Sequence, residues 1–288
     1  MKNQHDEGRR DGQFVLSTPT DVENELPFQL IGAGCDFYQY PIKRPFGFPL
    51  FQWIQTISGC GLLESPHGSW KSATGQGVLL YPDEEHTYYA VEEPWYVHWI
   101  SFSGHDVLNM LHYLDMKATG VYTVTNTAIT SSRIRKALQI LQSDYPLRGI
   151  DGSATVYALL LDFLKYIQPE GGDSRDNHVQ RLKPALDLIE DKLHQPLTLE
   201  HLASTIGVTP QYFCDLFRSV TSHRPTDYIN QRRVDRAKEL LFREPLTRVH
   251  DIGRRVGFES DSYFSTVFRK YEGVSPRKFR EVNAGNAG

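Results

Sequence analysis

The C-terminal part of the chain contains one helical module twice. Residues 199–228 and 249–279 carry matching aromatic, basic and proline residues at a constant spacing. The matched pairs are Phe213 and Phe264, Phe217 and Phe268, Arg218 and Arg269, and Pro225 and Pro276. Each copy predicts a short apolar helix, a turn at Gly207 or Gly257, and a second helix. That layout is typical of a helix-turn-helix, and the repetition makes the prediction stronger than a single copy would.

The turn of each module has the residues that such a turn needs. Gly207 stands where the chain must reverse sharply, so we expect a positive φ there. Thr209 and Ser260 precede the second helices and can serve as their N-caps. Helical spacing over residues 226–241 predicts one rigid helix between the modules. Two DNA-binding modules held by such a helix on one face of B-DNA, one helical turn apart, would lie about 34 Å from each other.

The second helix of a helix-turn-helix enters the major groove of DNA, so its exposed residues are the candidate contacts. They are Gln211, Tyr212, Cys214, Asp215 and Arg218 in the first copy, and Asp261, Ser262, Ser265, Thr266, Arg269 and Lys270 in the second. The amide of Gln211 can pair with both N6 and N7 of adenine. Asp215 can accept from cytosine N4, or pair with a neighbouring arginine. Arg218, Arg269 and Lys270 suit phosphates.

Charge and composition divide the chain into two domains. Residues 181–288 have a net charge of +4 and residues 1–180 a net charge of −8, so the basic part is the part that suits DNA. The expected parts are an arm at 1–25, a ligand-binding and dimerisation domain at 26–167, a flexible polar linker at 168–180, a DNA-binding domain at 181–282 and a tail at 283–288. The sequence has no transmembrane-length apolar run, no apolar signal-peptide core and no paired cysteine spacing. We therefore expect a cytoplasmic protein without a membrane partner.

The N-terminal half predicts many short strands followed by two helices. Residues 28–102 are rich in aromatic and β-branched residues with turn signals at short intervals, which is typical of a β-sandwich or barrel. We expect a hairpin around the glycine-rich residues 58–61. Residues 132–145 and 152–167 predict amphipathic helices, and the second is more apolar than one covered face requires.

Two stretches carry a resemblance to one family. The motifs YINQRRVDRAKELL and GFESDSYFSTVFRKYEGVSPRKFR resemble the linker helix and second helix-turn-helix of the AraC/XylS family of bacterial transcription regulators, and the likeness covers residues 179–281. Residues 75–89, GQGVLLYPDEEHTYY, resemble a small cupin jelly roll. The wider stretch from LIGAGC through PWYVHWISF resembles the sugar-sensing domain of the same family. The implied fold class is α+β: an N-terminal cupin-like β jelly roll with a two-helix dimerisation element, and a C-terminal all-α domain with two helix-turn-helix motifs.

The resemblance implies a sugar site in the jelly roll. At matching positions, Arg44 would bind sugar hydroxyls, Trp99 would stack on the sugar ring and Tyr88 would line the pocket. Phe48 and Gln52 stand at further lining positions. The chain departs from the family pattern at Phe48 and two residues before Trp99, so the implied pocket has another shape and arabinose is not implied. Without the resemblance, Trp99 is interpreted as barrel core and Arg44 as half of a surface ion pair.

The resemblance also implies an arm that folds over bound sugar and a dimer that forms through helices. The candidate lid residues over Trp99 and Arg44 are Phe14, Val15 and Leu16. The alternative for this segment is a disordered tail. Related regulators pair through antiparallel helices, and the seam residues expected from this are Leu160, Leu161 and Leu164.

These observations predict a ligand-responsive transcription regulator that activates genes of sugar utilisation. Its expected partners are double-stranded DNA, a sugar effector, RNA polymerase and a second copy of the chain. We expect no enzyme activity, cofactor or metal, because the H-x-H pair and glutamate of metal cupins are missing and no nucleophile–base set stands out. Two alternatives stay open: the same architecture sensing a non-sugar molecule such as a peptide, siderophore or aromatic, and a cupin enzyme fused to a DNA-binding domain.

Overall fold

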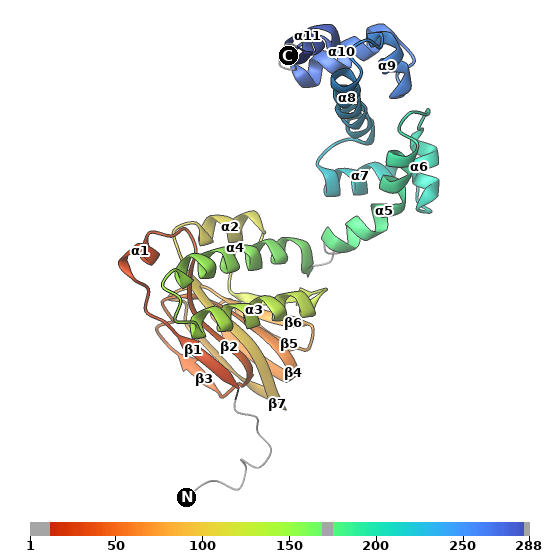
Figure 1. Ribbon diagram of the computed structural model, residues 1–288. Helices are drawn as coiled ribbons and strands as arrows, with labels where there is room; N and C mark the ends of the chain where they lie inside the picture. The colour runs from red at the N-terminus through yellow and green to blue at the C-terminus, as the bar shows by residue number, and fades with distance from the viewer. Residues whose placement is uncertain (1–11, 169–174, 285–288) are drawn as a thin grey trace, which may run out of the picture. The chain divides into compact units, whose positions relative to one another are not determined.

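The computed structural model describes residues 12–168 and 175–284, and the chain divides into two compact units, Met1–Asp176 and Asn177–Gly288. The first unit is a sheet covered by helices, and the second is helical (Figure 1). Residues 1–11 of the expected arm, residues 169–174 of the expected linker and residues 285–288 of the expected tail lie outside the described residues. Within the described ranges, none of the helices combines the length and apolar character that a membrane span needs.

The first unit is built on the antiparallel pairing of two long strands, β4 and β7. Its strands are β1 (Gln13–Leu16), β2 (Gln29–Tyr38), β3 (Ile42–Arg44), β4 (Phe51–Ser65), β5 (Gly68–Ala73), β6 (Gln76–Leu80), β7 (His86–Ser103), β8 (Gly120–Val124) and β9 (Ile167–Gln168). The order across the sheet is β1-β2-β7-β4-β6-β8-β9. β2 and β6 flank one end of the β4–β7 pair, and β3 and β5 flank its other end. The long pair therefore belongs to both halves of a cupin-like roll, which is the fold class that the sequence predicted.

The glycine-rich residues 58–61 are part of strand β4, so the hairpin predicted there is wrong. The pairing of β4 with β7 is irregular at this point, and the chain continues in the same direction. A Cβ at Gly61 would come within 2.2 Å of the Trp95 ring. These glycines therefore permit a bulge and a close approach between strands, which give the same sequence signal as a chain reversal.

Side chains alternate between two buried faces along β7. Trp95, Val97 and Trp99 lie in the core of the roll, which we call the inner face. Ile100 and Phe102 lie on the opposite face, which we call the helix face because it packs against the helices of this unit. Those helices are α1 (Asp21–Asn24), α2 (Val107–Tyr113), α3 (Thr127–Gln142) and α4 (Arg148–Tyr166), of which α2, α3 and α4 lie together on one side of the sheet (Figure 1).

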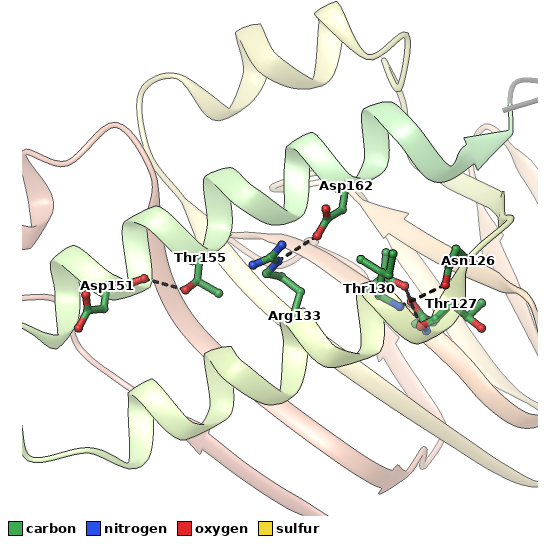
Figure 2. A network of polar contacts seen from close by, with 9 residues as sticks. Asn126, Thr127, Thr130, Arg133, Asp151, Thr155 and Asp162 are labelled. Atoms are coloured by element: carbon green, nitrogen blue, oxygen red, sulfur yellow. Dashed lines mark hydrogen bonds and ion pairs between the residues drawn. The ribbon is translucent and has the colours of Figure 1, made fainter. Parts of the chain in front are cut away.

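A polar network on the helix face joins β4 to the start of α3 (Figure 2). Gln55 is completely buried, and its amide nitrogen donates to the Ser131 hydroxyl at 2.7 Å and to the Thr127 carbonyl at 3.1 Å. The Thr130 hydroxyl donates in return to Gln55 Oε1. Asn126 caps the same helix by accepting from the Ile129 amide. Because every polar atom of the Gln55 side chain has a partner, this buried amide is compatible with the surrounding apolar core.

Helix α4 buries one side and exposes an apolar stripe on the other. Asp162 of α4 accepts from Arg133 of α3 at 2.9 Å, which ties the two helices together (Figure 2). Leu160 is fully buried in the core of the unit, so its expected place at a seam between two copies is wrong. At 3.6 residues per turn, the helix points Leu160 at the sheet when its neighbour Leu161 points outward. The outward stripe, spaced alternately four and three residues apart, consists of Ile150, Ala154, Tyr157, Leu161 and Leu164.

The second unit contains two helix-turn-helix modules with separate cores. Its helices are α5 (Arg175–Asp191), α6 (Leu199–Thr205), α7 (Pro210–Thr221), α8 (Pro225–Arg243), α9 (Val249–Arg255), α10 (Asp261–Glu272) and α11 (Pro276–Ala284). The start of α8 packs with α6 and α7, and the rest of α8 packs with α9 and α10. Thr209 and Ser260 accept the predicted capping hydrogen bonds. Gly207 has a φ of 68°, which confirms the predicted turn.

Helix α5 begins inside the stretch that the sequence predicted as a flexible linker. Leu182, Ala185 and Ile189 are fully buried in the core of the first module. Their spacing is helical, but the polar residues that precede them do not mark where the helix begins. The structured unit therefore starts earlier in the chain than the composition indicates.

We expect Gln55→Ala to lower the free energy of unfolding of the first unit by about 3 kcal/mol, because Ser131 and Thr130 lose their partner and a cavity remains. Urea unfolding followed by tryptophan fluorescence measures this unit alone, since the chain's four tryptophans, at positions 53, 70, 95 and 99, all lie in it. The exposed Gln139→Ala on α3 is the control and should change stability little. Equal midpoints for the two variants would contradict the role of the network.

Candidate ligand site and nucleic-acid interface

Two rows of side chains cross the inner face of the sheet. Directly paired residues of antiparallel strands lie on the same face, so the register defines each row. From β1 through β2, β7 and β4 to β6, the first row consists of Phe14, Gly34, Trp99, Ile54 and Val78. The second row consists of Leu16, Gly32, Ser101, Gln52 and Leu80. The rows bring together two predicted ligand residues, Trp99 and Gln52, with the predicted arm residue Phe14.

The Trp99 ring packs closely against strand β2 because its neighbour there, Gly34, has no side chain. A Cβ on Gly34 would lie 2.3 Å from the indole Nε1. The Phe14 ring centroid is 6.3 Å from that of Trp99, and the Phe14 side chain is 53% exposed. Val15, the next residue of β1, packs against the helix-face core. The alternation of a strand therefore excludes Val15 from a cover over Trp99, and residues 13–16 are an ordered strand.

Arg44 sits at the end of β3 and contacts two more of the predicted residues. Its Nη1 donates to Gln52 Oε1 at 3.1 Å, and its guanidinium carbon lies 4.1 Å from the centroid of the Phe48 ring. The same nitrogen is 3.4 Å from His86 Nε2. Within the described residues no carboxylate pairs with Arg44, so the surface ion pair considered from the sequence does not form.

His86 was not among the predicted ligand residues, although it ends the YPDEEH motif. Its Nδ1 is 2.8 Å from the Glu84 carbonyl oxygen, to which it donates, so Nε2 is left to accept from Arg44. Burial lowers the pKa of His86, which keeps the ring neutral at pH 7. The Tyr88 ring stacks on it with centroids 5.9 Å apart, and burial raises the pKa of the Tyr88 hydroxyl. Both groups are therefore neutral beside the Arg44 cation.

Ser101 is a second residue of this face that sequence reasoning missed. Its side chain is 1% exposed, and its hydroxyl has no hydrogen-bond partner among the residues that the structure describes. It lies between Gly32 and Gln52 in the second row. The usable signal was the strict alternation of WYVHWISF, which places Ser101 on the same face as Trp99.

The inner face thus offers hydrogen-bond donors next to apolar rings. Arg44 and the Gln52 amide nitrogen are donors, and the hydroxyls of Tyr88 and Ser101 can donate or accept. Trp99 supplies an aromatic surface beside them. Such a set suits a small molecule with several oxygen acceptors and one apolar face. Among the residues that the structure describes, no three His, Cys, Asp or Glu side chains cluster closely enough to hold a metal ion.

The first helix-turn-helix presents the predicted residues with one change in pairing. Gln211, Tyr212 and Arg218 are exposed on α7, as is Asp215, while Cys214 is half-buried. Gln211 Nε2 donates to Asp215 Oδ2 at 3.3 Å, so the partner of Asp215 here is Gln211 and not an arginine.

Tyr212 has a partner that sequence reasoning missed. Its hydroxyl accepts from Arg181 Nη1 at 3.0 Å, and the Arg181 guanidinium lies over the Tyr212 ring. Arg181 belongs to α5, which the sequence did not predict as a helix next to this module. The contact adds a cation beside the exposed face of α7.

The second module exposes all of its predicted residues on α10. They are Asp261, Ser262, Ser265, Thr266, Arg269 and Lys270. Thr266 donates to the Ser262 carbonyl at 2.9 Å, and Lys270 Nζ is 3.1 Å from Asp227 of α8, which raises the pKa of Lys270. Arg269 forms no ion pair within the described part of the chain. Arg269 is therefore the stronger of the two candidates for a phosphate contact.

The two modules predict different effects for a base contact and a phosphate contact. Gln211→Ala should lose about 1–3 kcal/mol of binding free energy at a subset of base positions. Arg269→Ala should weaken binding to all sequences and reduce the slope of log K against log salt by about one. Binding of duplexes selected from a random library by the full chain measures both effects, with the exposed Arg277→Ala on α11 as the control. A changed base preference in Arg269→Ala would show that its assigned role is wrong.

Comparison with known proteins gives two family matches, one in each unit. Residues 39–160 match the AraC-like ligand binding domain, and residues 202–281 match the helix-turn-helix domain family. The Msm operon regulatory protein of Streptococcus mutans is 26% identical over 80% of this chain and 84% of its own length. The MmsAB operon regulatory protein of Pseudomonas aeruginosa is 25% identical over 82% of this chain and 76% of its own.

A third relative is the arabinose operon regulatory protein of Escherichia coli, which is 26% identical over 85% of this chain and 84% of its own length. All three matches extend over both units, and the relatives are regulators rather than enzymes. The ligand-binding match contains Arg44, Tyr88 and Trp99, and the helix-turn-helix match contains both recognition helices. With a ligand-binding jelly roll followed by two helix-turn-helix modules, the chain belongs to the AraC family of ligand-responsive, DNA-binding transcription regulators.

Proposed function

We propose that the effector is a sugar, bound on the inner face of the jelly roll, and that the protein activates genes of sugar utilisation. One observation carries this proposal. Arg44 is hydrogen-bonded to Gln52, and Gln52 lies in the row next to that of the Trp99 indole. Sugars present hydroxyl oxygens to polar groups and an apolar ring face to aromatic side chains, so both kinds of partner are needed at one site. The non-sugar alternative requires only that the oxygen acceptors belong to another small molecule.

The arm strand supports a role as a cover for the bound effector. Phe14 contacts Trp99 and remains half-exposed, so a ligand against the indole would also contact Phe14. Leu16 lies opposite Gly32, and a Cβ on that glycine would be 2.7 Å from the Leu16 side chain. A ligand that contacts β1 as well as β7 would favour the docked arm over other arm positions, which is the differential affinity that a switch requires.

The exposed stripe of α4 supports a dimer. Alternate spacings of four and three residues are the pattern of two helices packed along a common seam. Ile150 is 52% exposed and Tyr157 is 44% exposed, although both are apolar or aromatic. Leu161 and Leu164 continue the stripe. The proposed seam therefore consists of these outward residues and does not include Leu160. An activator of this design acts in the cytoplasm and contacts RNA polymerase when bound near a promoter.

A thermal-shift screen of the full chain against pentoses, hexoses and their acids tests the sugar proposal, because a ligand that binds the folded state raises Tm by mass action. Arg44→Ala should weaken binding of the best sugar about 10- to 100-fold, since it removes a charged hydrogen-bond donor. Trp99→Ala and Phe14→Ala should weaken it as well. Lys43→Ala, the exposed neighbour on β3, should not. A response to aromatic acids or peptides and to no sugar would exclude the sugar class and leave the regulator intact.

Replacing Leu161 and Leu164 together by Asp should raise the dimer dissociation constant at least about a hundredfold, because two charges would be desolvated at the seam. Sedimentation velocity of the full chain measures the change. Lys165→Asp, exposed on the same helix, is the control for the added negative charge. Tryptophan fluorescence should show that the jelly roll of the double variant is still folded. An unchanged dimer with both leucines replaced would reject this interface.

A further inference from the structure

The relative position of the two helix-turn-helix modules depends on helix α8 and on the contacts made beside it. The modules have separate hydrophobic cores, and α8 contributes Ile229 to the first and Val234 to the second. A shared helix alone leaves each module able to pivot on its own packing surface. Contacts that reach from one module to the other are therefore needed to fix the angle between the recognition helices.

Arg233 on α8 makes such a contact. Its Nε donates to the Leu193 carbonyl at 2.9 Å and its Nη2 to the Gln195 carbonyl at 2.8 Å, both in the segment between α5 and α6 of the first module. Its guanidinium carbon lies 5.7 Å from the Phe258 ring centroid, in the turn between α9 and α10 of the second module. Burial lowers the pKa of Arg233, so two carbonyls and a ring replace the water that this cation loses.

Gly257 brings the second module directly onto this junction. It has a φ of 99°, and a Cβ there would lie 2.6 Å from the Leu193 carbonyl oxygen and 2.9 Å from Arg233 Nε. Backbone of the first module, the arginine of α8 and backbone of the second module therefore meet at one point. Gly257 follows Gly207 by 50 residues, whereas Phe264 follows Phe213 by 51, so the second copy has one extra residue between its glycine and its second helix, in the turn that contains Phe258.

We propose that Arg233 is a positioning residue that fixes the separation of the two recognition helices and so makes the protein selective for the number of base pairs between two half-sites. This inference rests on DNA binding by both modules. One added base pair rotates a half-site by about 36° around the axis of B-DNA, which has 10–10.5 base pairs per turn. A pair of rigidly held modules cannot follow that rotation, whereas a pair joined by α8 alone can follow more of it.

The test starts from duplexes selected out of a random-sequence library by the full-length protein. Variants Gln211→Ala and Ser265→Ala assign the half-site of each module through the base positions at which preference is lost. Duplexes with one or two base pairs added or removed between the half-sites then serve as probes. The measured quantity is the ratio of the dissociation constants for altered and selected spacing, which does not change when a variant merely binds all DNA less well.

We expect the wild type to lose about tenfold or more in affinity for one added base pair, and Arg233→Ala to lose less than about threefold, because modules that can turn about α8 keep more of their specific contacts at the altered spacing. Arg233→Lys should behave like Arg233→Ala, because an ammonium group keeps the charge but cannot hold two carbonyls in a fork. The adjacent Arg232→Ala is the matched control. Within the described ranges its ion pair is with Glu190 of the first module, so this variant should keep the wild-type ratio.

Three results would overturn the proposal: a wild-type spacing ratio in both Arg233 variants, an equal loss of affinity at all spacings, or a selected site read by one module alone. If Arg233→Ala does not fold, as judged by helical circular dichroism, Arg233→Lys and Gly257→Ala decide the question, since the added methyl group pushes on the same junction from the other module. Failure to select any duplex would count against DNA binding itself and is therefore distinguishable from failure of the positioning role.

Discussion

Three indole rings packed against glycines hold the jelly roll together. A Cβ would come within 2.3 Å of Trp99 at Gly34, 2.2 Å of Trp95 at Gly61 and 2.1 Å of Trp53 at Gly77. In each case the glycine lies on a strand paired with, or next to, the strand of the tryptophan. A large ring on one strand thus requires the smallest residue on another, so that a shift in register would drive backbone into indole. This packing also fixes the position of the first row of side chains, which contains Trp99.

Both faces of the sheet bury polar groups. On the helix face, the buried Gln55 has a partner for its donor and its acceptor. On the inner face, Ser101 is equally buried and has none among the described residues, and Arg44 contacts neutral groups. Unpaired buried polar groups cost free energy unless something else satisfies them. The helix face also has an unpaired buried group among the described residues, Trp53 Nε1, so burial without a partner does not by itself mark a ligand site. The unpaired hydroxyl of Ser101 supports the proposed effector site because it lies next to Gln52 and in the row beside Trp99.

The duplicated modules share a core pattern but offer different free groups to DNA. Gln211 and Asp215 bond to each other within α7, so a base contact by either competes with that bond. In the second module Lys270 is held by Asp227, whereas Arg269 has no ion pair among the residues that the structure describes. The residues that repeat between the two modules are therefore mainly those of the cores, because both cores need the same stripe of aromatic residues. Most of the exposed residues of the two modules differ. Because their cores are separate, the contacts of Arg233 with Leu193, Gln195 and Phe258 join segments that the cores do not join.

The sequence by itself determined the modules, because periodic apolar stripes, caps at Thr209 and Ser260 and the turn at Gly207 are local features whose physics does not depend on distant residues. The family resemblance predicted Arg44, Gln52 and Trp99 as ligand residues, and strand alternation could have added Ser101 to the same face. Only the tertiary structure decided that residues 58–61 continue a strand, that Leu160 faces inward and that helix α5 starts at Arg175. It also decided the junction of Arg233 with Leu193 and Gly257. These outcomes depend on which surface covers each residue, and contacts between segments far apart in the chain leave no periodic signal in either segment.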